Sequence, residues 1–191
     1  MTDWAALSYV VVDVEGNGQR PPDLVELAAV RIEHGHLGDP ASWLVRPPRP
    51  ITPFAKQIHG IANEHVAAAP AFAEVSAEVR KALDAPALVA HNAHVDVGVL
   101  ERELGDWECP EVFDTLKLAR RLLPGRPSYK LGSLVEAFGL DHGLADMQKP
   151  HRAEYDTIVT ARLFAHLASS RSLEELRGQS KRGGDDEPSL F

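Results

Sequence analysis

The sequence predicts a three-layer α/β domain with a mixed central sheet, on the basis of its element order, its length and its composition. Strand patterns come early in the chain, strand and helix then alternate, and helices end the pattern. The 191 residues are 44% hydrophobic, which is enough for one domain with a full core. We expect that domain to cover residues 1–169, and the polar, glycine-rich residues 170–191 to form a flexible C-terminal tail.

Short apolar runs bounded by turn residues indicate the strands. Their β-branched and small apolar residues are typical of buried strands, and the turn-rich segment 34–40 favours a hairpin connection. Four prolines within 47–53 then exclude regular strand pairing. The expected strands are 8–15, 24–33, a weaker 41–45, and 86–90.

Apolar residues at helical spacing indicate the helices. Asn92 follows the last predicted strand and is a candidate N-cap for the second helix. Pro124, Gly125 and Pro127 separate the third helix from the fourth. The expected helices are 71–83, one that begins after Asn92, 116–123, 131–138 and 153–167.

The charge balance excludes a protein that coats nucleic acid by bulk charge, because 28 acidic residues outnumber 20 basic ones. It leaves open an enzyme whose carboxylates bind metal. No apolar run approaches the roughly 18 residues of a membrane span, and the first residues lack the pattern of an export signal. The single cysteine, Cys109, fits a reducing compartment. We therefore expect a cytoplasmic protein with no membrane partner.

Two acidic residues, Asp13 and Glu15, end the first predicted strand and project to the same face of it. Neighbouring carboxylates at the end of so apolar a strand repel each other unless a cation neutralises them. A solvated strand end is the alternative for this pair taken alone. Gly16 and Gly18 follow directly and leave room for a ligand to approach the backbone.

Two further polar groups lie at element boundaries. Asp96 falls in the first turns of the helix after Asn92, beside the end of a strand, where open α/β sheets usually bind ligands. Its alternative role is to complement the helix dipole. We expect His151 in the loop that enters the last helix and Asp156 inside that helix. A histidine beside fixed carboxylates suits a general base better than a metal ligand.

These three groups together indicate a site for divalent cations. Four carboxylates without cysteine ligands favour hard ions, Mg²⁺ or Mn²⁺. Two such ions about 4 Å apart can clamp the attacking and leaving oxygens of a phosphodiester. The predicted reaction is hydrolysis, with His151 as the base that deprotonates the attacking water.

The same residues resemble a known family. Asp13-x-Glu15, Asp96 and His151-x4-Asp156 match, in order and spacing, the motifs of the DEDDh 3′→5′ exonucleases, which include bacterial proofreading (epsilon) subunits and ribonuclease T. The likeness extends over residues 8–168 through the segments LVELAAV, ITPFAKQIHGI, ALVAHNAHVD, FDTLKLARRLLP and YKLGSLVEAFGL. It implies a ribonuclease H-like fold and exonuclease activity at nucleic-acid 3′ ends, preferably single-stranded.

The resemblance also implies roles for individual residues. It implies that five residues are catalytic. Four of them would be the ligands of two metal ions, namely Asp13, Glu15, Asp96 and Asp156, and His151 would be the general base. It also implies five substrate-binding residues. Gly16 and Asn17 follow the acidic pair, and His59 and Gly60 would line the pocket for the 3′-terminal nucleotide. Asn92 would support the second motif.

Two positions depart from the family pattern. Gly16-Asn17-Gly18 stands where Thr-Thr-Gly is usual, so only backbone contacts to the terminal nucleotide are retained. His94 stands two residues before Asp96, where an aromatic residue is common. We interpret His94 as a packed residue that needs a hydrogen-bond partner, and a place lining the site is the alternative.

Five basic residues and no acidic ones lie within 115–135, which predicts a path for a phosphate backbone. Ordinary solvated helix faces are the alternative. Phe54 and Tyr129 are the nearby aromatic candidates for base stacking, so we expect only a few nucleotides to be bound.

The last residues, Ser189, Leu190 and Phe191, follow an acidic stretch and resemble the short peptides by which bacterial replication and repair proteins bind the sliding clamp. The leading hypothesis is a metal-dependent exonuclease acting on DNA in proofreading or repair. RNA 3′-end trimming is one alternative. An inactive module tethered to a clamp or polymerase is the other, and the presence of all five site residues argues against it.

Overall fold

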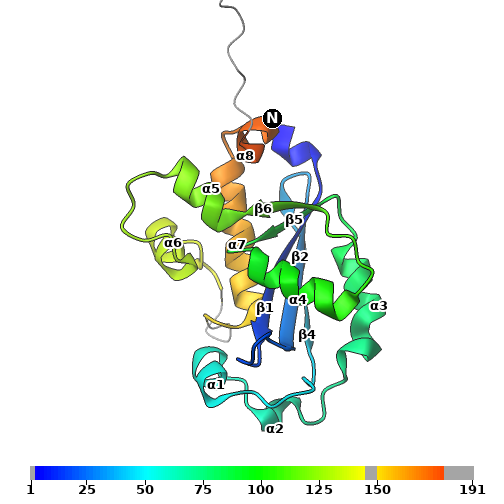
Figure 1. Ribbon diagram of the computed structural model, residues 1–191. Helices are drawn as coiled ribbons and strands as arrows, with labels where there is room; N and C mark the ends of the chain where they lie inside the picture. The colour runs from blue at the N-terminus through cyan, green and yellow to red at the C-terminus, as the bar shows by residue number, and fades with distance from the viewer. Residues whose placement is uncertain (1–2, 145–149, 179–191) are drawn as a thin grey trace, which may run out of the picture.

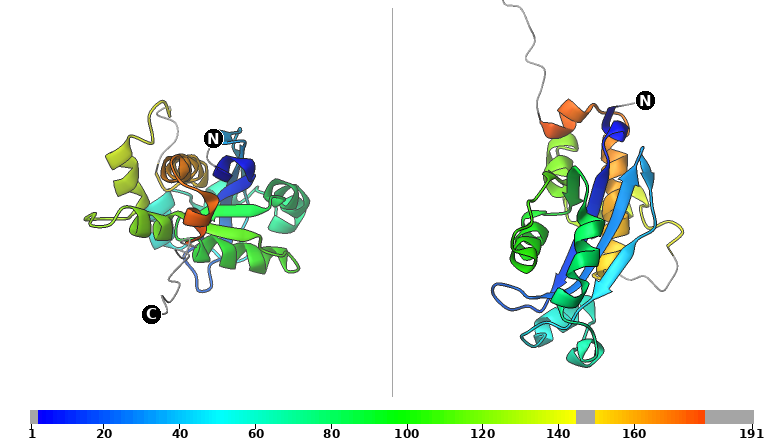
Figure 2. Two further views of the ribbon diagram at one scale, coloured as in Figure 1. Left: turned by 90° about the horizontal axis from the view of Figure 1, so that it is seen from above. Right: turned by 90° about the vertical axis from the view of Figure 1, so that its right-hand side faces the viewer.

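The computed structural model describes residues 3–144 and 150–178 as a mixed sheet with helices on both faces (Figures 1 and 2). The strands lie in the order β3-β2-β1-β5-β6, with β4 also paired to β2. The pairs among β1, β2, β3 and β4 are antiparallel, whereas β5 is parallel to both β1 and β6. The predicted three-layer architecture with a mixed sheet is confirmed. The strands are β1 (Tyr9–Gly16), β2 (Leu24–Glu33), β3 (His36–Leu37), β4 (Ala41–Leu44), β5 (Ala87–Ala90) and β6 (Glu111–Asp114).

The helices follow the predicted pattern, with additions at both ends of the sheet. A short 3-10 turn, Asp3–Ala6, precedes β1. No helix within the described residues is long and apolar enough to cross a bilayer. The helices are α1 (Pro53–His59), α2 (Asn63–Val66), α3 (Phe72–Leu83), α4 (His94–Leu104), α5 (Thr115–Leu122), α6 (Leu131–Phe138), α7 (Ala153–Ala168) and α8 (Leu173–Arg177).

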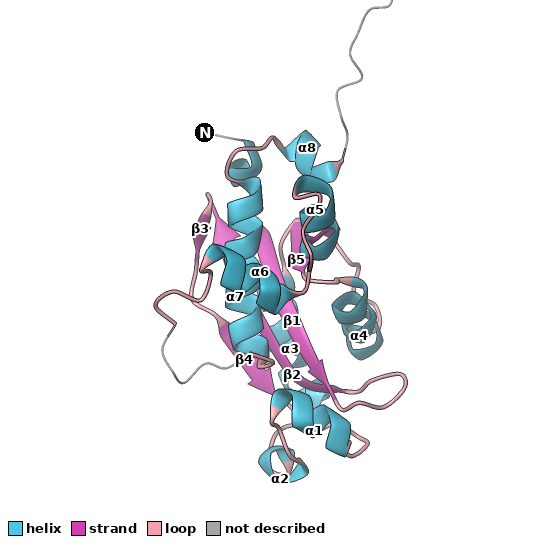
Figure 3. Cartoon of the chain, turned by 90° about the vertical axis from the view of Figure 1, so that its left-hand side faces the viewer, coloured by secondary structure: helices cyan, strands magenta, loops and turns pink. Residues whose placement is uncertain are grey.

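Alternation along β1 builds two separate cores. Tyr9 and Val11 pack on one face against Phe164 and other residues of α7. Val10 and Val12 pack on the opposite face against α3 and α4. Because side chains alternate along a strand, Asp13 and Glu15 lie on the α7 face. Figure 3 shows α7 running along β1 and β2 on that face, with α1 beyond the end of β1.

Strand β6 and helix α1 are among the elements that the sequence patterns do not predict, each for an identifiable reason. Strand β6 has only four residues, of which two are exposed, so its period is too short to detect. Helix α1 begins at the end of the proline-rich segment, with Pro53 in its first turn. Proline is tolerated there because the first N–H groups of a helix have no intrahelical partner. Thr52 caps the helix by accepting a hydrogen bond from the Ala55 N–H at 3.2 Å.

The prediction that Asn92 caps the second helix is wrong. Asn92 has a left-handed φ of 68°, and α4 starts at His94 after Ala93, which makes no side-chain cap bond. The reason lies in a contact from elsewhere in the sequence. The Asn92 N–H donates to the Oδ1 of Asp114 at 3.1 Å, which fixes Asn92 in a turn between β5 and α4.

Helix α8 falls within the stretch that the sequence predicts as tail. Leu176 is buried in the core on the α7 face, and Arg121 donates to the carbonyls of Glu175 and Leu176 at 2.7 Å. The folded domain therefore extends to residue 178 at least. The segment Ser189, Leu190 and Phe191, for which a sliding-clamp contact is predicted, lies outside the described residues.

Candidate active site

The acidic pair occupies a part of β1 that extends past its neighbouring strand. Asp13 and Glu15 are both partly buried. The last residue of β1 with a partner in β5 is Val11, so the edge of β1 beyond it is open on that side. The chain after β5 turns away through His91 and Asn92 and enters α4. The parallel strand β5 therefore ends beside the acidic pair, which is the arrangement that a ligand site at this junction requires.

Asp96 reaches this open edge from α4, on the opposite face of the sheet. Its side chain is 5% exposed, and its Oδ1 accepts a hydrogen bond from the Val14 N–H at 3.1 Å. Val14 lies between Asp13 and Glu15, so the bond holds a third carboxylate next to the pair. The expected meeting of the first two motifs is thus a feature of the fold.

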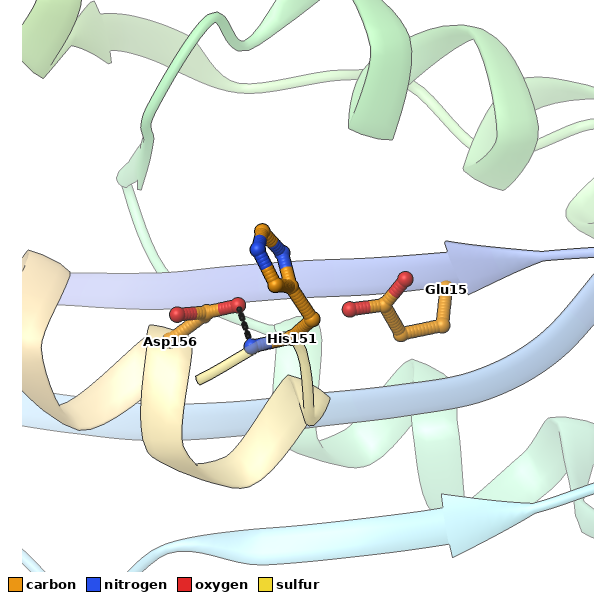
Figure 4. A group of neighbouring side chains, drawn as sticks. All are labelled: Glu15, His151 and Asp156. Carbon is orange, nitrogen blue, oxygen red and sulfur yellow. Dashed lines mark hydrogen bonds between the residues drawn. The ribbon is translucent and has the colours of Figure 1, made fainter. Parts of the chain in front are cut away.

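The third group completes the cluster from α7. His151 lies just before α7, and Asp156 lies in its first turn, as the sequence predicts. Glu15, His151 and Asp156 each offer one ligand atom, and these atoms lie within 4.8 Å of one another. Figure 4 shows His151 between the two carboxylates. The His151 N–H also donates to the Oδ2 of Asp156 at 3.0 Å, which ties the histidine backbone to the helix.

Burial raises the pKa of every carboxylate in the cluster, and for Asp13 and Glu15 repulsion by the neighbouring carboxylates raises it further. Burial is the largest cause in each case. It raises the pKa of Glu15 to about 8, helped by the negative charge of Asp156, and that of Asp96 to about 7. The pKa of Asp156 rises to about 6, and that of Asp13 lies well above its usual range because of burial and the neighbouring Asp96. A cation bound among these groups would relieve the repulsion.

The donor set fits a hard divalent cation. Four carboxylates supply only oxygen ligands, which Mg²⁺ and Mn²⁺ prefer. The single imidazole, His151, is exposed at the edge of the cluster.

A cavity of about 1190 Å³ opens in front of the cluster. Asp13, His151 and Asp156 line one part of it, and basic side chains line another, namely Arg120, Arg126 and Lys130. Three of the five basic residues of 115–135 therefore face the same space as the carboxylates. The other two, Lys117 and Arg121, line a separate groove of about 740 Å³ beside β6.

His59 is a structural histidine in a neutral state. It is 5% exposed, and its Nδ1 accepts a hydrogen bond from the Ile61 N–H at 3.0 Å. Its Nε2 must then carry the proton, which it shares with the Gly16 carbonyl at 3.2 Å. Burial lowers the pKa of His59, which favours the neutral ring. His59 thus anchors the end of β1, whereas Gly60 is exposed and ends α1 with a φ of 74°.

The side chain of Asn17 is also used within the fold, and the nucleotide contact that the resemblance implies for this residue is one from its backbone. The residue is fully buried. Its amide nitrogen donates to Asp23 and to the Arg49 carbonyl, and its oxygen accepts from the N–H groups of Gln19 and Asp23. Both hydrogens and both lone pairs are used. Asn17 therefore holds the loop that follows β1.

The packed interpretation of His94 needs correction as well. His94 is the first residue of α4 and is exposed. It lines the groove beside β6, on a different part of the surface from the cavity in front of the carboxylates. The His94 side chain therefore points away from the acidic cluster, because side chains two residues apart on a helix differ by about 200° in direction.

Three residues that support the cluster were not predicted. Asp114 caps α5 and accepts from the N–H groups of Asn92 and Leu116. His91 bridges the Thr115 hydroxyl and the Tyr129 carbonyl at 2.9 and 3.1 Å, which joins the basic loop to the end of β5. Glu26 binds Arg152 from within β2. Two of the three could have been found from the sequence. Asp114 directly precedes a helical pattern, and Glu26 interrupts an apolar strand.

Comparisons with known proteins agree with this geometry. The model of the RNase T exonuclease family matches residues 10–164. The 3′-5′ exonuclease DinG of Bacillus subtilis is 37% identical over 176 residues, which are 88% of this chain and 18% of DinG. The DNA polymerase III PolC-type of Streptococcus thermophilus is 34% identical over 165 residues, or 82% of this chain and 11% of the polymerase.

A solved structure is similar over nearly its whole length. Exonuclease X, in complex with 5′-overhanging duplex DNA, has a TM-score of 0.71 and 34% identity, covering 84% of this chain and 91% of its own. The expected ribonuclease H-like fold is confirmed by this similarity. The chain spans less than a fifth of the length of the two curated relatives, 18% and 11%.

Proposed function

Because this chain belongs to the RNase T family of DEDDh-type exonucleases, we propose that it is a divalent-metal-dependent 3′→5′ exonuclease that hydrolyses phosphodiester bonds at DNA 3′ ends. One observation carries the proposal. Four carboxylates from three elements converge beside an exposed histidine, at a cavity whose other residues include three cations. This combination suits an anionic substrate held against a metal site.

Asp13, Glu15, Asp96 and Asp156 would hold two ions, Mg²⁺ or Mn²⁺. When bound, such ions supply the positive charge that stabilises the attacking and leaving oxygens of a phosphodiester. Backbone N–H groups fix two of these four carboxylates in advance. Asp96 is held by the Val14 N–H, and Asp156 by the His151 N–H. Preorganised ligands of this kind need no rearrangement during the reaction.

His151 acts as the general base. Its imidazole is exposed to the cavity, and its backbone is fixed by Asp156, so the ring can take a proton from the attacking water and release it to solvent. Arg120, Arg126 and Lys130 bind the phosphates upstream of the terminal nucleotide. Contacts to phosphates carry no sequence information, so the enzyme would act on ends of any sequence.

DNA is the favoured substrate class. The similar proteins include a DNA polymerase III, and Exonuclease X was solved with duplex DNA that has a 5′ overhang. RNA trimming is the second candidate, because discrimination depends on contacts to the 2′-hydroxyl. An inactive module tethered to another protein would need no intact acidic cluster, which makes this the weakest alternative. Binding to a sliding clamp through residues 189–191 stays a prediction from the sequence.

The deciding experiment uses DNA and RNA oligonucleotides of one sequence, labelled at the 5′ end. Incubation with Mg²⁺ or Mn²⁺ is expected to give a ladder that shortens from the 3′ end, faster for DNA, and EDTA is expected to abolish it. A faster rate on RNA would reassign the substrate. Absence of cleavage by folded, metal-loaded protein would contradict the proposal.

A further inference from the structure

Glu26, near the start of β2, is a buried carboxylate that the proposed reaction does not use. It is 5% exposed and stands within the otherwise apolar run 24–30. Its Cα partner across the sheet is Glu15. Cross-strand partners share a face of the sheet, so Glu26 lies directly beside the acidic cluster. A carboxylate this buried needs strong partners, and those partners indicate its role.

Both oxygens of Glu26 bind the start of α7. Its Oε1 accepts from the Nη2 of Arg152 at 2.5 Å, and its Oε2 from the Nε of Arg152 at 3.0 Å. Two parallel bonds to a planar guanidinium fix its orientation as well as its charge. The Oε2 also accepts from the Ala153 N–H at 2.9 Å.

These bonds replace an ordinary helix cap. Ala153 is the first residue of α7, and its N–H has no partner within the helix. Arg152, the N-cap residue, makes no side-chain cap bond. Glu26 therefore caps α7 from a neighbouring strand, and it restrains the two residues that follow His151.

His151 has a backbone conformation that needs such restraint. Its φ is 61°, in the left-handed region that residues with side chains seldom adopt. Such conformations persist where the surroundings hold them. The His151 N–H is bound by Asp156. Two carboxylates thus restrain His151. Asp156 binds its N–H, and Glu26 binds the two residues that follow it.

We propose that Glu26 is a positioning residue for the reaction: by binding Arg152 and Ala153, it holds the His151 backbone in the conformation that presents the imidazole to the acidic cluster. The inference rests on the proposed function, in which His151 is the base. Small displacements of a catalytic group are costly, which gives a rigid strand an advantage as the anchor.

The same contact has a second effect that the test must separate. Arg152 places a positive charge near Glu15, which opposes the rise in the pKa of that carboxyl. An effect through Glu15 does not require the imidazole. An effect through His151 does. Removal of the imidazole therefore distinguishes the two.

The test is a double-mutant cycle between Glu26→Gln and His151→Ala, with kcat and KM measured on labelled single-stranded DNA in Mn²⁺. Glu26→Gln alone is expected to lower kcat roughly 10–100-fold, with KM within about twofold. In the His151→Ala background, the same substitution is expected to change kcat by less than about twofold, because the group that it positions is gone.

A loss of equal size in both backgrounds would overturn the proposal and favour the effect of Arg152 on Glu15. Wild-type kcat in Glu26→Gln would overturn it too. If His151→Ala itself retained full activity, the assignment of the base in the proposed function would fail, and the single variant alone reveals this. If Glu26→Gln does not fold, Arg152→Gln takes its place in the cycle. It breaks the same ion pair, and its side chain is only half-buried, so the substitution disturbs the core less.

A matched control comes from another arginine–carboxylate pair. Arg80 and Asp106 form an ion pair at 2.5 Å on the surface, away from the cavity. Asp106→Asn removes one carboxylate charge, as Glu26→Gln does. It is expected to leave kcat unchanged in both backgrounds.

Discussion

The Asp96 carboxylate accepts a hydrogen bond from the Val14 N–H at 3.1 Å, and this bond joins the two faces of the sheet at the acidic cluster. Asp96 comes from α4, which packs against Val10 and Val12, whereas Asp13 and Glu15 face α7. The contact is feasible because β5 ends before Val14 and leaves its N–H without a strand partner. Asp96 thus satisfies a backbone donor and supplies an anion to the site.

These two roles of Asp96 can be separated by Asp96→Asn. The amide oxygen can still accept from Val14, so stability should change little, while the anionic ligand is lost. We expect kcat to fall by more than the roughly 10–100-fold cost of losing an outer partner of a metal ligand. Steady-state kinetics in Mg²⁺ and thermal unfolding measure the two effects. Activity near that of the wild type would remove Asp96 from the ligand set.

His151→Ala should slow turnover without loss of divalent-ion binding. General-base catalysis contributes roughly 10²–10⁴-fold, so kcat should fall within that range. Mn²⁺ titration followed by calorimetry should give a similar affinity for both proteins, since the carboxylates remain. His94→Ala is the matched control, because His94 is exposed but lines the groove beside β6. A rate reduction below about tenfold would exclude His151 as the base.

The five proposed catalytic residues could be selected from the sequence because each stands at the boundary of a predicted element, Asp96 at the start of the helix that follows β5. Asp13 and Glu15 end an apolar strand, and His151 and Asp156 stand at the entry to a periodic helix. Their convergence follows from the order of parallel and antiparallel strands, which the alternation of elements indicates. The four expected strands and five expected helices are present, with boundaries that differ by at most two residues.

Asn17 and His59 show what local patterns do not contain. The resemblance implies a backbone contact to the substrate for Asn17 and a place in the nucleotide pocket for His59, and the side chains of both residues form hydrogen bonds within the fold. Asn17 binds the Arg49 carbonyl, 32 residues away, and His59 binds the Gly16 carbonyl, 43 residues away. Bonds between distant segments leave no periodic trace in the sequence. The prediction that Asn92 caps α4 is wrong for the same reason, because Asp114 holds Asn92 in a turn.

Asn17→Ala tests the structural role directly. Loss of the amide leaves buried donors and acceptors around Asp23 and Arg49 without their partner, at a cost of roughly 1–3 kcal/mol in the free energy of unfolding. Urea unfolding measures this change. Gln19→Ala, in the same loop but with an exposed side-chain bond, should cost less. Unchanged stability with a raised KM would instead indicate that Asn17 binds the nucleotide.

The raised carboxyl pKa values predict how pH affects the protein without metal. Burial raises the pKa of Glu15 from 4.5 to about 8, so the folded state binds this proton more tightly than the unfolded state. The stability that this preference contributes is present below the unfolded pKa and is lost as pH rises through the folded one. In EDTA, the melting temperature should therefore fall between pH 5 and pH 8.

Divalent ions should oppose this fall of the melting temperature with rising pH. The ions bind the deprotonated carboxylates, so their affinity increases with pH. Mn²⁺ should raise the melting temperature more at pH 8 than at pH 6. Differential scanning fluorimetry at both pH values, with EDTA or Mn²⁺, measures the difference. An equal effect of Mn²⁺ at both values would contradict the assignment of protonated carboxylates to the ion site.

Lys130 and Lys117 offer a charge-matched test of the substrate path. Both are exposed lysines of the basic segment, but Lys130 lines the cavity in front of the carboxylates, and Lys117 lines the groove beside β6. Each phosphate contact on a single strand contributes about 0.7 to the slope of log affinity against log salt. Lys130→Ala should therefore raise KM for single-stranded DNA and reduce this slope by about that amount. Lys117→Ala removes the same charge and should change neither. Equal effects of the two substitutions would mean that bulk charge, and not the cavity, guides the nucleic acid.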